Sequence, residues 1–139
     1  MQRKVKELML IKAFGLNISD AIKYEDYLGH EGTSTIIETQ DLRGEDCLML
    51  LHKNGSRNVI EDILEVSYGS DYYILNNESR KERQRKAFEL LDVHIGDKVK
   101  RYTNVYTCEE LSDQILLMCC RVGMPVGSLY RFSDWEKIQ

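Results

Sequence analysis

"TSTIIETQDLRGEDCLMLLHKNGSRN", residues 33–58, decides the class of fold that we expect for this chain. Its runs 33–40 and 46–53 carry the β-branched and apolar residues that are typical of strands, and turn-forming residues lie between them. Asn54-Gly55 is a strong signal for a second hairpin turn directly afterwards. The stretch therefore predicts antiparallel strands that pair with one another.

Helical segments are expected before these strands. Residues 5–15 have the apolar spacing of a short helix, which Gly15 ends in a left-handed conformation. Ser19 has the side chain of an N-cap, and it precedes a second expected helix over 20–28. The N-terminal third of the chain is thus predicted to place two helices beside the strands.

Further helices are expected after the strands. The charged run 78–93 predicts a long helix that starts at Asn77. Thr107 and Glu110 have the spacing of a capping box, and they open the apolar segment 108–122. We interpret that segment as a helix that ends at the following glycine.

The pattern of elements predicts an α+β fold, in which a small, mostly antiparallel sheet packs against helices. Segment 58–68 fits a helix and a strand equally well, whereas 71–76 has the composition of a strand. We expect one compact domain over 1–139, with an acidic N-terminal half (1–76) and a helical, more basic C-terminal half (77–139).

Composition bounds the function. The chain has 139 residues, 42% hydrophobic and 30% charged, with a net charge of −4. A protein of this charge is soluble and has no overall attraction for phosphate. Charged residues interrupt the apolar N-terminal run, so neither a signal peptide nor a membrane span is expected. We therefore predict a cytoplasmic protein that does not enter a membrane.

The cysteines give no sign of a metal or disulfide site. The four of them lack the spacing of zinc ligands, and cytoplasmic thiols stay reduced. We expect them to pack in the core, and we expect no metal and no cofactor. The four are Cys47, Cys108, Cys119 and Cys120.

Charge is distributed unevenly along the chain. Residues 1–76 carry eight basic and thirteen acidic side chains, a net charge of −5, whereas 80–101 carry eight basic and four acidic ones, a net charge of +4. A basic district of this kind is a candidate for contact with nucleic acid, although a solvated helix face has the same appearance. Its basic residues are Arg80, Lys81, Arg83, Arg85, Lys86, Lys98, Lys100 and Arg101.

"GMPVGSLYRF", residues 123–132, has the letters of a turn followed by a second helix. It resembles the recognition segment of the TetR family of DNA-binding regulators. The resemblance implies a helix-turn-helix over 108–132, in which Tyr130 contacts phosphate and Arg131 faces the groove. The alternative is a short strand over 125–132 that docks on the sheet. The net negative charge of the C-terminal segment favours the strand.

Tyrosines near acidic residues are the candidates for protein contact, because tyrosine is enriched at the hot spots of interfaces. The acidic half of the chain is expected to face a basic protein surface. The candidate partner-binding residues are Tyr24, Glu25, Asp26, Tyr27, Tyr72 and Tyr73.

Catalysis has one candidate residue. His30 lies in a glycine-flanked loop beside Glu31, where a histidine is able to act as a general base. No residue with the spacing of a partner accompanies it, and the phosphate-binding glycine motifs are absent from the sequence. We therefore expect a protein that binds rather than catalyses.

The function expected from these features is that of a partner-binding regulator or inhibitor. In size, acidity and tyrosine content the chain is similar to the small proteins of phages and mobile elements that block host or defence enzymes. The alternative is a helix-turn-helix transcription regulator that uses residues 108–132.

Overall fold

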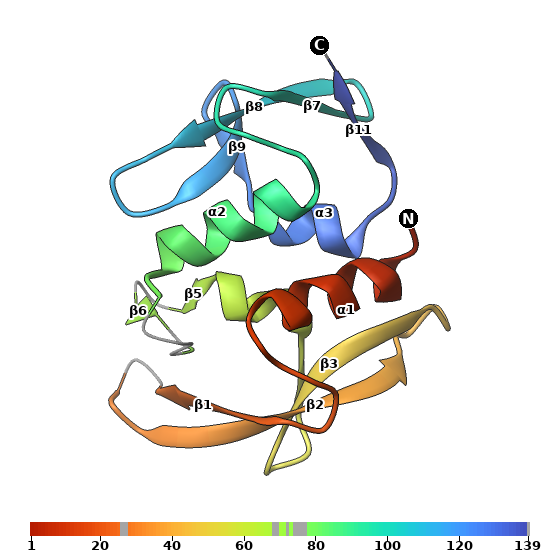
Figure 1. Cartoon of the computed structure of the whole chain (residues 1–139), viewed down its shortest axis with the longest axis vertical. Coiled ribbons are helices and arrows are strands. Elements are labelled where there is room, and N and C mark those ends of the chain that lie inside the picture. Colours follow the sequence, from red (N-terminus) through yellow and green to blue (C-terminus); the bar gives the residue numbers. More distant parts are fainter. Residues whose placement is uncertain (26–27, 68–69, 72, 74–77, 139) are drawn as a thin grey trace.

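Two antiparallel sheets enclose a layer of helices in this computed structural model, which describes residues 1–25, 28–67, 70–71, 73 and 78–138. Figure 1 shows the four-stranded sheet on one side of the helices and the five-stranded sheet on the other. The α+β class and the antiparallel pairing are as expected. The strands, however, form two large sheets rather than a single small one.

The first sheet has the order β1-β2-β3-β4, and the second has the order β10-β9-β8-β7-β11. The elements, in chain order, are α1 (Arg3–Ala13), β1 (Ala21–Glu25), β2 (Glu31–Gln40), β3 (Asp46–His52), β4 (Arg57–Val59), the 3₁₀ helix η1 (Ile60–Leu64), β5 (Val66–Ser67), β6 (Ser70–Asp71), α2 (Arg80–Leu90), β7 (Lys98–Arg101), β8 (Asn104–Glu110), β9 (Ile115–Cys119), β10 (Val122–Met124), α3 (Gly127–Arg131) and β11 (Trp135–Ile138).

Local signals explain the first hairpins. β2 and β3 pair in register as expected, and Asp41 Oδ1 accepts hydrogen bonds from the N–H groups of Arg43 and Glu45 in the turn between them. Gly55, at φ +89°, forms the predicted turn from β3 to β4. The turn chemistry in the sequence is therefore sufficient to fix this part of the fold.

Two of the expected helices form. α1 ends where predicted, with Gly15 at φ +72° and the N–H of Leu16 bonded to the carbonyl of Ile11. α2 begins at Arg80, because Ser79 Oγ accepts the N–H of Glu82 as an N-cap. The expected start at residue 77 lies outside the described residues.

The helix expected over 20–28 is wrong. Ser19 has a left-handed φ of 78°, and its N–H donates to the carbonyl of Ile36. Residues 21–25 then run as strand β1 against β2, with Ile22 buried and its neighbours exposed. Pairing with β2 satisfies this backbone and overrides the N-cap signal.

The helix expected over 108–122 is also wrong. Strands β8, β9 and β10 occupy this part of the chain and pair antiparallel in sequence. Cys108, Ile115 and Leu117 face the interior, whereas Leu116 lies on the opposite face. A continuous apolar run has neither the 3.6-residue period of a helix nor the two-residue period of a strand. The hydrogen bonds of the sheet therefore decide its conformation.

Segment 125–132, for which the charge favoured a strand, contains the short helix α3. A helix-turn-helix is nevertheless not formed over 108–132, because the first of its two helices is a set of strands. Segment 58–68 combines both of its expected forms, since β4 ends at Val59, η1 follows and β5 begins at Val66. Most of the strand expected over 71–76 lies outside the described residues.

The core fills the space between the two sheets, and both sheets contribute to it. Among the described residues, no helix combines the length and the apolar character that crossing a membrane requires. The largest buried apolar side chains include Leu10, Ile11, Phe14, Ile36, Leu48, Leu50, Ile60, Phe88, Leu117 and Leu129.

Candidate functional site

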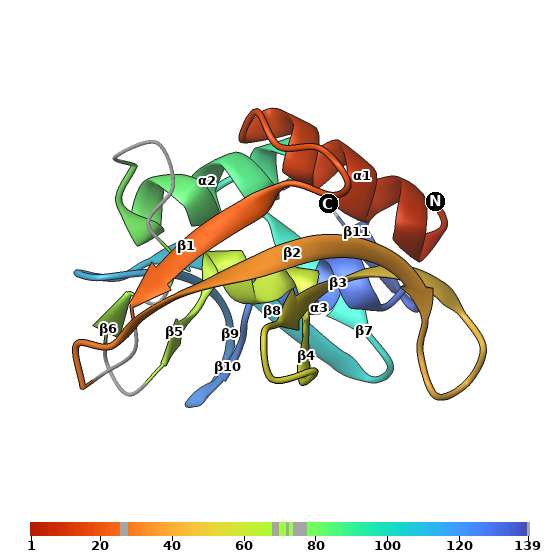
Figure 2. The same cartoon turned by 90° about the horizontal axis from the view of Figure 1, so that it is seen from below.

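The end of the β1–β2 hairpin beside its connecting loop carries a surface hollow of about 360 Å³, large enough for a side chain or a small ligand. Three strands meet there, and Figure 2 shows the hairpin projecting along one edge of the molecule. We call this region the hairpin-end surface; it consists of Lys23, Tyr24, Glu25, Glu31, Gly32, Thr33 and Lys53.

The register of the hairpin places like charges opposite each other. Glu25 pairs with Glu31, and both side chains are exposed. None of the described residues forms an ion pair with either carboxylate. Carboxylates that face each other across two strands destabilise a hairpin. The hairpin-end surface therefore holds two carboxylates that form no ion pair with a described residue, and the ammonium groups of Lys23 and Lys53 lie on the same surface.

Tyr24 forms the aromatic part of this surface. Its ring packs on Gly32, where an added Cβ would lie 2.5 Å from the ring and its hydroxyl, so only glycine fits beneath it. The ring also meets His52 and Tyr73 edge to face, at centroid distances of 5.3 and 5.8 Å. Tyr24 is half-buried and is held on three sides.

A chain of hydrogen bonds lies beneath Tyr24. Tyr73 OH and Ser34 Oγ are 3.1 Å apart, and Ser34 Oγ is 3.0 Å from His52 Nδ1. His52 Nε2 continues to Asn58 Oδ1 at 3.1 Å, and Asn58 Nδ2 donates to Asp62 Oδ2 at 2.8 Å. The chain of hydrogen bonds joins β2, β3, β4 and η1 to Tyr73, which forms an isolated β-bridge with Tyr24 of β1.

The donors in this chain can be assigned from its end. Asn58 donates to Asp62 through Nδ2, so it offers its carbonyl oxygen to His52. Nε2 of His52 then donates to Asn58, and in the tautomer that has its proton on Nε2 alone the Nδ1 atom accepts from Ser34 Oγ. Ser34 in turn accepts from Tyr73 OH. In each hydrogen bond the donor is therefore the residue nearer to Tyr73 and the acceptor is the residue nearer to Asp62.

A serine, a histidine and an asparagine in this order also occur in nucleophilic catalysis. Here Ser34 is 0% exposed and does not line the hollow, so no reacting carbon reaches its hydroxyl. The arrangement instead fixes the positions of His52 and Tyr73, on which Tyr24 rests. Of this cluster only Tyr73 was predicted from the sequence, because the register of β2 with β3 that joins Ser34 to His52 is not visible in the sequence.

Some of the acidic side chains of the N-terminal half lie inside the protein. Among the described residues of this half, three basic side chains (Arg3, Lys4 and Lys6) and six carboxyl groups lie wholly or partly inside, and four of the six are affected most by burial. Burial raises the pKa of all four, to about 7 for Glu7 and for Glu65. The surface of this half is therefore less acidic than its sequence total. The four are Glu7, Glu61, Asp62 and Glu65.

The basic district 80–101 is largely neutralised within the chain. Arg83 is buried and donates to the carbonyls of Ile63 and Glu78. Five more of its basic residues form ion pairs: Arg80 with Asp113, Lys81 with Glu110, Arg85 with Glu82 and Glu110, Lys86 with Glu78, and Arg101 with Asp134. The remaining two, Lys98 and Lys100, are exposed on β7 without an ion pair among the described residues.

Tyr130 and Arg131, the other candidates for nucleic-acid contact, both have partners within the chain. Tyr130 is 0% exposed, and its hydroxyl donates to the carbonyl of Ala87. Arg131 pairs with the buried Glu61 at 2.6 Å. The burial of Tyr130 leaves its hydroxyl no access to a phosphate, whereas Arg131 has a side chain that is 40% exposed, so that its contact with nucleic acid stays a prediction.

Some of the other residues that were predicted to bind a partner or to act in catalysis lie at or beneath the surface, and the others lie outside the described residues. His30 is exposed in the loop before β2, and Glu25 and Tyr24 belong to the hairpin-end surface. Tyr73 is buried beneath that surface. Three further candidates, Asp26, Tyr27 and Tyr72, lie outside the described residues.

Two of the cysteines pack in the core as expected, namely Cys47 and Cys108, whereas Cys119 is half-buried and Cys120 is exposed. Across the described ranges, no three histidine, cysteine or acidic side chains gather as a metal site would require.

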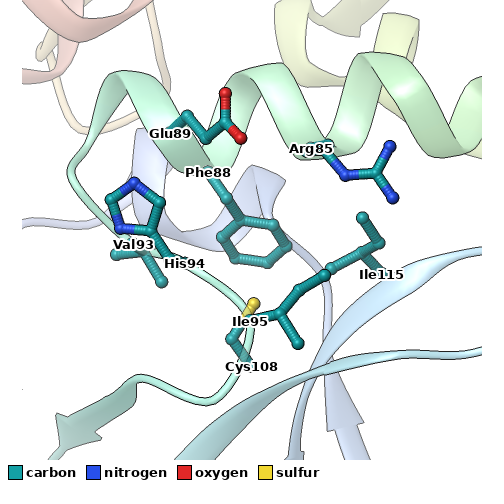
Figure 3. A pocket seen from close by; sticks show the side chains of 8 residues that line it. All are labelled: Arg85, Phe88, Glu89, Val93, His94, Ile95, Cys108 and Ile115. Carbon is teal, nitrogen blue, oxygen red and sulfur yellow. The ribbon is translucent and has the colours of Figure 1, made fainter.

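A pocket of about 50 Å³ between α2 and the second sheet is shown in Figure 3. The ring of Phe88 points towards Cys108 and Ile115, and Arg85 and His94 lie at the rim. Burial raises the pKa of the Cys108 thiol to about 11, which disfavours the reactive thiolate. The pocket accommodates a water molecule or two, and it is too small for an organic ligand.

Comparisons with models of protein families, with curated proteins and with solved structures found no match to this chain.

Proposed function

We propose that this protein is a regulator or inhibitor that acts by binding a protein partner through its hairpin-end surface, and not by catalysis. One observation carries the proposal: Glu25 and Glu31 face each other, exposed and unpaired among the described residues, beside a held tyrosine ring and a hollow. A fold that keeps like charges together in this way gains stability when a cationic group binds between them.

The chemistry of the surface favours an arginine or lysine of the partner. Its cation would form charge-assisted hydrogen bonds with Glu25 and Glu31, whereas Tyr24, on the other face of the strand, would offer apolar contact area to another part of the partner. Tyr24 loses little conformational freedom on binding, because Gly32, His52 and Tyr73 already hold it. Preorganisation of this kind increases affinity.

The proposal extends to the class of partner. Basic protein surfaces are typical of enzymes that handle nucleic acid, because such surfaces bind phosphate. A small protein that covers such a surface would inhibit the enzyme, as small phage and mobile-element proteins do to host or defence enzymes. We place the encounter in the cytoplasm.

The test is capture of the partner from native host extract, followed by kinetics with the purified pair. The double substitution Glu25→Lys with Glu31→Lys should reduce affinity at least tenfold, mainly through slower association, and wild-type association should slow as salt is raised. The matched control, Asp46→Lys with Glu89→Lys, makes the same change in net charge on exposed residues elsewhere. Equal loss in both double variants, or none in the first, contradicts the proposal.

A further inference from the structure

The second sheet has a face that no described element covers. Val99, Cys108 and Leu117 point from this sheet into the core. Residues that alternate with them therefore point away from the helices, which Figure 1 shows on one side of the sheet only. We call this surface the outer face, and the residues used below are Lys98, Val105, Thr107, Glu109, Leu116 and Met118.

The outer face combines apolar side chains with charged ones, because Lys100 and Glu136 lie on it as Lys98 and Glu109 do. Leu116 and Met118 cluster over Gly123, where an added Cβ would lie 3.2 Å from Leu116 Cδ1 and 3.3 Å from Met118 Sδ. Val105 is 40% exposed. Apolar side chains on an open sheet face are typical of surfaces that another sheet covers.

The register gives this face a symmetric pattern around Thr107. Lys98 lies beside Thr107 on β7, and Met118 lies beside it on β9. Glu109 and Val105 lie on β8 itself, two residues to either side of Thr107. Neighbouring strands are about 4.8 Å apart and a two-residue step is about 6.8 Å, so these four residues form a cross whose arms along β8 are about 2 Å longer than its arms across the strands.

We propose that the outer face binds the outer face of a second copy of this chain. The two copies are then related by a two-fold axis that lies between the two faces. The axis passes over Thr107 and runs diagonally to the strands, so it exchanges the arms of the cross. Lys98 of one copy then meets Glu109 of the other, and Met118 meets Val105. Each contact occurs twice, as in any isologous interface.

Charge complementarity selects a second copy as the occupant. Lys98 and Glu109 form no ion pair with any of the described residues, and the exchange pairs each with the opposite charge. The strands of the two sheets cross at a steep angle in this arrangement, which is one of the two favoured geometries of sheet packing. The face spans only five short strands, so the dimer is weak and forms reversibly.

The test uses charge reversal and sedimentation at protein concentrations from about 10 µM to about 1 mM, where interfaces of this size assemble. The wild-type mass should rise from the monomer value of 16.2 kDa towards twice that value. Lys98→Glu and Glu109→Lys should each remain monomeric, because each places like charges together twice. The control Glu89→Lys, on α2, should behave as wild type.

Mixing the two variants gives the decisive result. In a mixed pair, Lys98→Glu supplies two carboxylates and Glu109→Lys supplies two ammonium groups, so both ion pairs are restored with reversed sign. An equimolar mixture should therefore dimerise although neither variant does so alone. A monomeric wild type, dimers of either single variant equal to wild type, or a mixture that stays monomeric would each overturn the proposal. Circular dichroism confirms that the variants are folded.

Discussion

At the scale of single residues, the stability of the hairpin end depends on buried polar groups that have specific partners. Ser34 both accepts from Tyr73 and donates to His52, so it is the residue through which the two are joined. Buried polar groups stabilise a fold when all of them are satisfied and destabilise it when one loses its partner.

Ser34→Ala should lower the free energy of unfolding by about 1–3 kcal/mol, because the substitution leaves Nδ1 of His52 and the hydroxyl of Tyr73 without this partner. Thr35→Ala, at the next position of the same strand and only partly buried, is the control and should change stability by less than about 0.5 kcal/mol. Urea unfolding measures both. Equal effects of the two substitutions would show that the chain of hydrogen bonds contributes nothing particular to stability.

Glu65 gives the protein a pH dependence. Burial raises its pKa from 4.5 to about 7; Arg80 opposes this rise, and the neighbouring Asp62 and Glu61 add to it. One of its carboxylate oxygens is buried without a hydrogen bond. The folded state thus binds a proton that the unfolded chain has released. The contribution of Glu65 is fully present below pH 4.5 and is lost as the pH rises through 7.

Glu65→Gln should therefore flatten the decrease in stability between pH 5 and pH 8, leaving the part that arises from Glu7, whose pKa is also raised to about 7. The measurement is the urea midpoint at several pH values, with the exposed Glu89→Gln as the control. An unchanged slope in Glu65→Gln would mean that this carboxyl group is ionised in the folded protein throughout the range.

At the scale of elements, α3 shows how tertiary contacts decide between the helix and the strand that the sequence allows for 125–132. A single helical turn is unstable by itself. The carbonyls of Leu129 and Phe132, at its C-terminal end, accept hydrogen bonds from Lys6 Nζ and also from Trp135 Nε1. These donors come from α1 and β11, so the helix depends on both ends of the chain.

Lys6→Met should destabilise the protein by about 1–3 kcal/mol, because it removes charge-assisted hydrogen bonds to two carbonyls while keeping most of the apolar volume. Lys12→Met, on an exposed position of the same helix, is the matched control. Thermal unfolding of the two variants makes the comparison. If Lys6→Met were as stable as the control, Trp135 alone would be sufficient to hold α3.

The elements that could be predicted from the sequence are those whose turns and caps are local. The β2–β3 hairpin, the turn at Gly55 and the end of α1 follow from side chains within a few residues. β1 could also have been found, because 21–25 alternate between polar and apolar residues. The strands over 104–124 could not, since nothing within that segment indicates that β7 pairs with it.

The candidate site was predicted only in part. Tyr24 and Glu25 were identified by residue type, and the hairpin-end surface contains both. Its other carboxylate, Glu31, and its support, Ser34 and His52, depend on the register of β1 with β2 and β3. A register between strands is not visible until the strands themselves are assigned.

At the scale of the whole molecule, the helical layer separates two surfaces with different proposed roles. The hairpin-end surface belongs to the first sheet and the outer face to the second, and Figure 1 shows these sheets on opposite sides of the helices. A dimer formed through the outer face would leave both hairpin-end surfaces free. Such a dimer would bind a repetitive or dimeric partner with increased avidity.

Paired and unpaired charges also lie in different parts of the molecule. Most basic side chains of 80–101 are paired within the chain, so this segment has little charge left for phosphate. Glu25 and Glu31, which form no ion pair with a described residue, lie at the hairpin end. We therefore expect the affinity for a basic protein to exceed that for duplex DNA, which filter binding at low salt compares directly.

Mapping of amide chemical shifts by NMR tests whether the hairpin-end surface is the partner interface. The spectra of isotope-labelled protein are compared with and without its partner. The account predicts the largest changes in 21–25 and 31–35 and at Lys53, with 80–90 and 127–131 nearly unchanged. Changes confined to 80–101 or to α3, with β1 and the start of β2 unaffected, would contradict it.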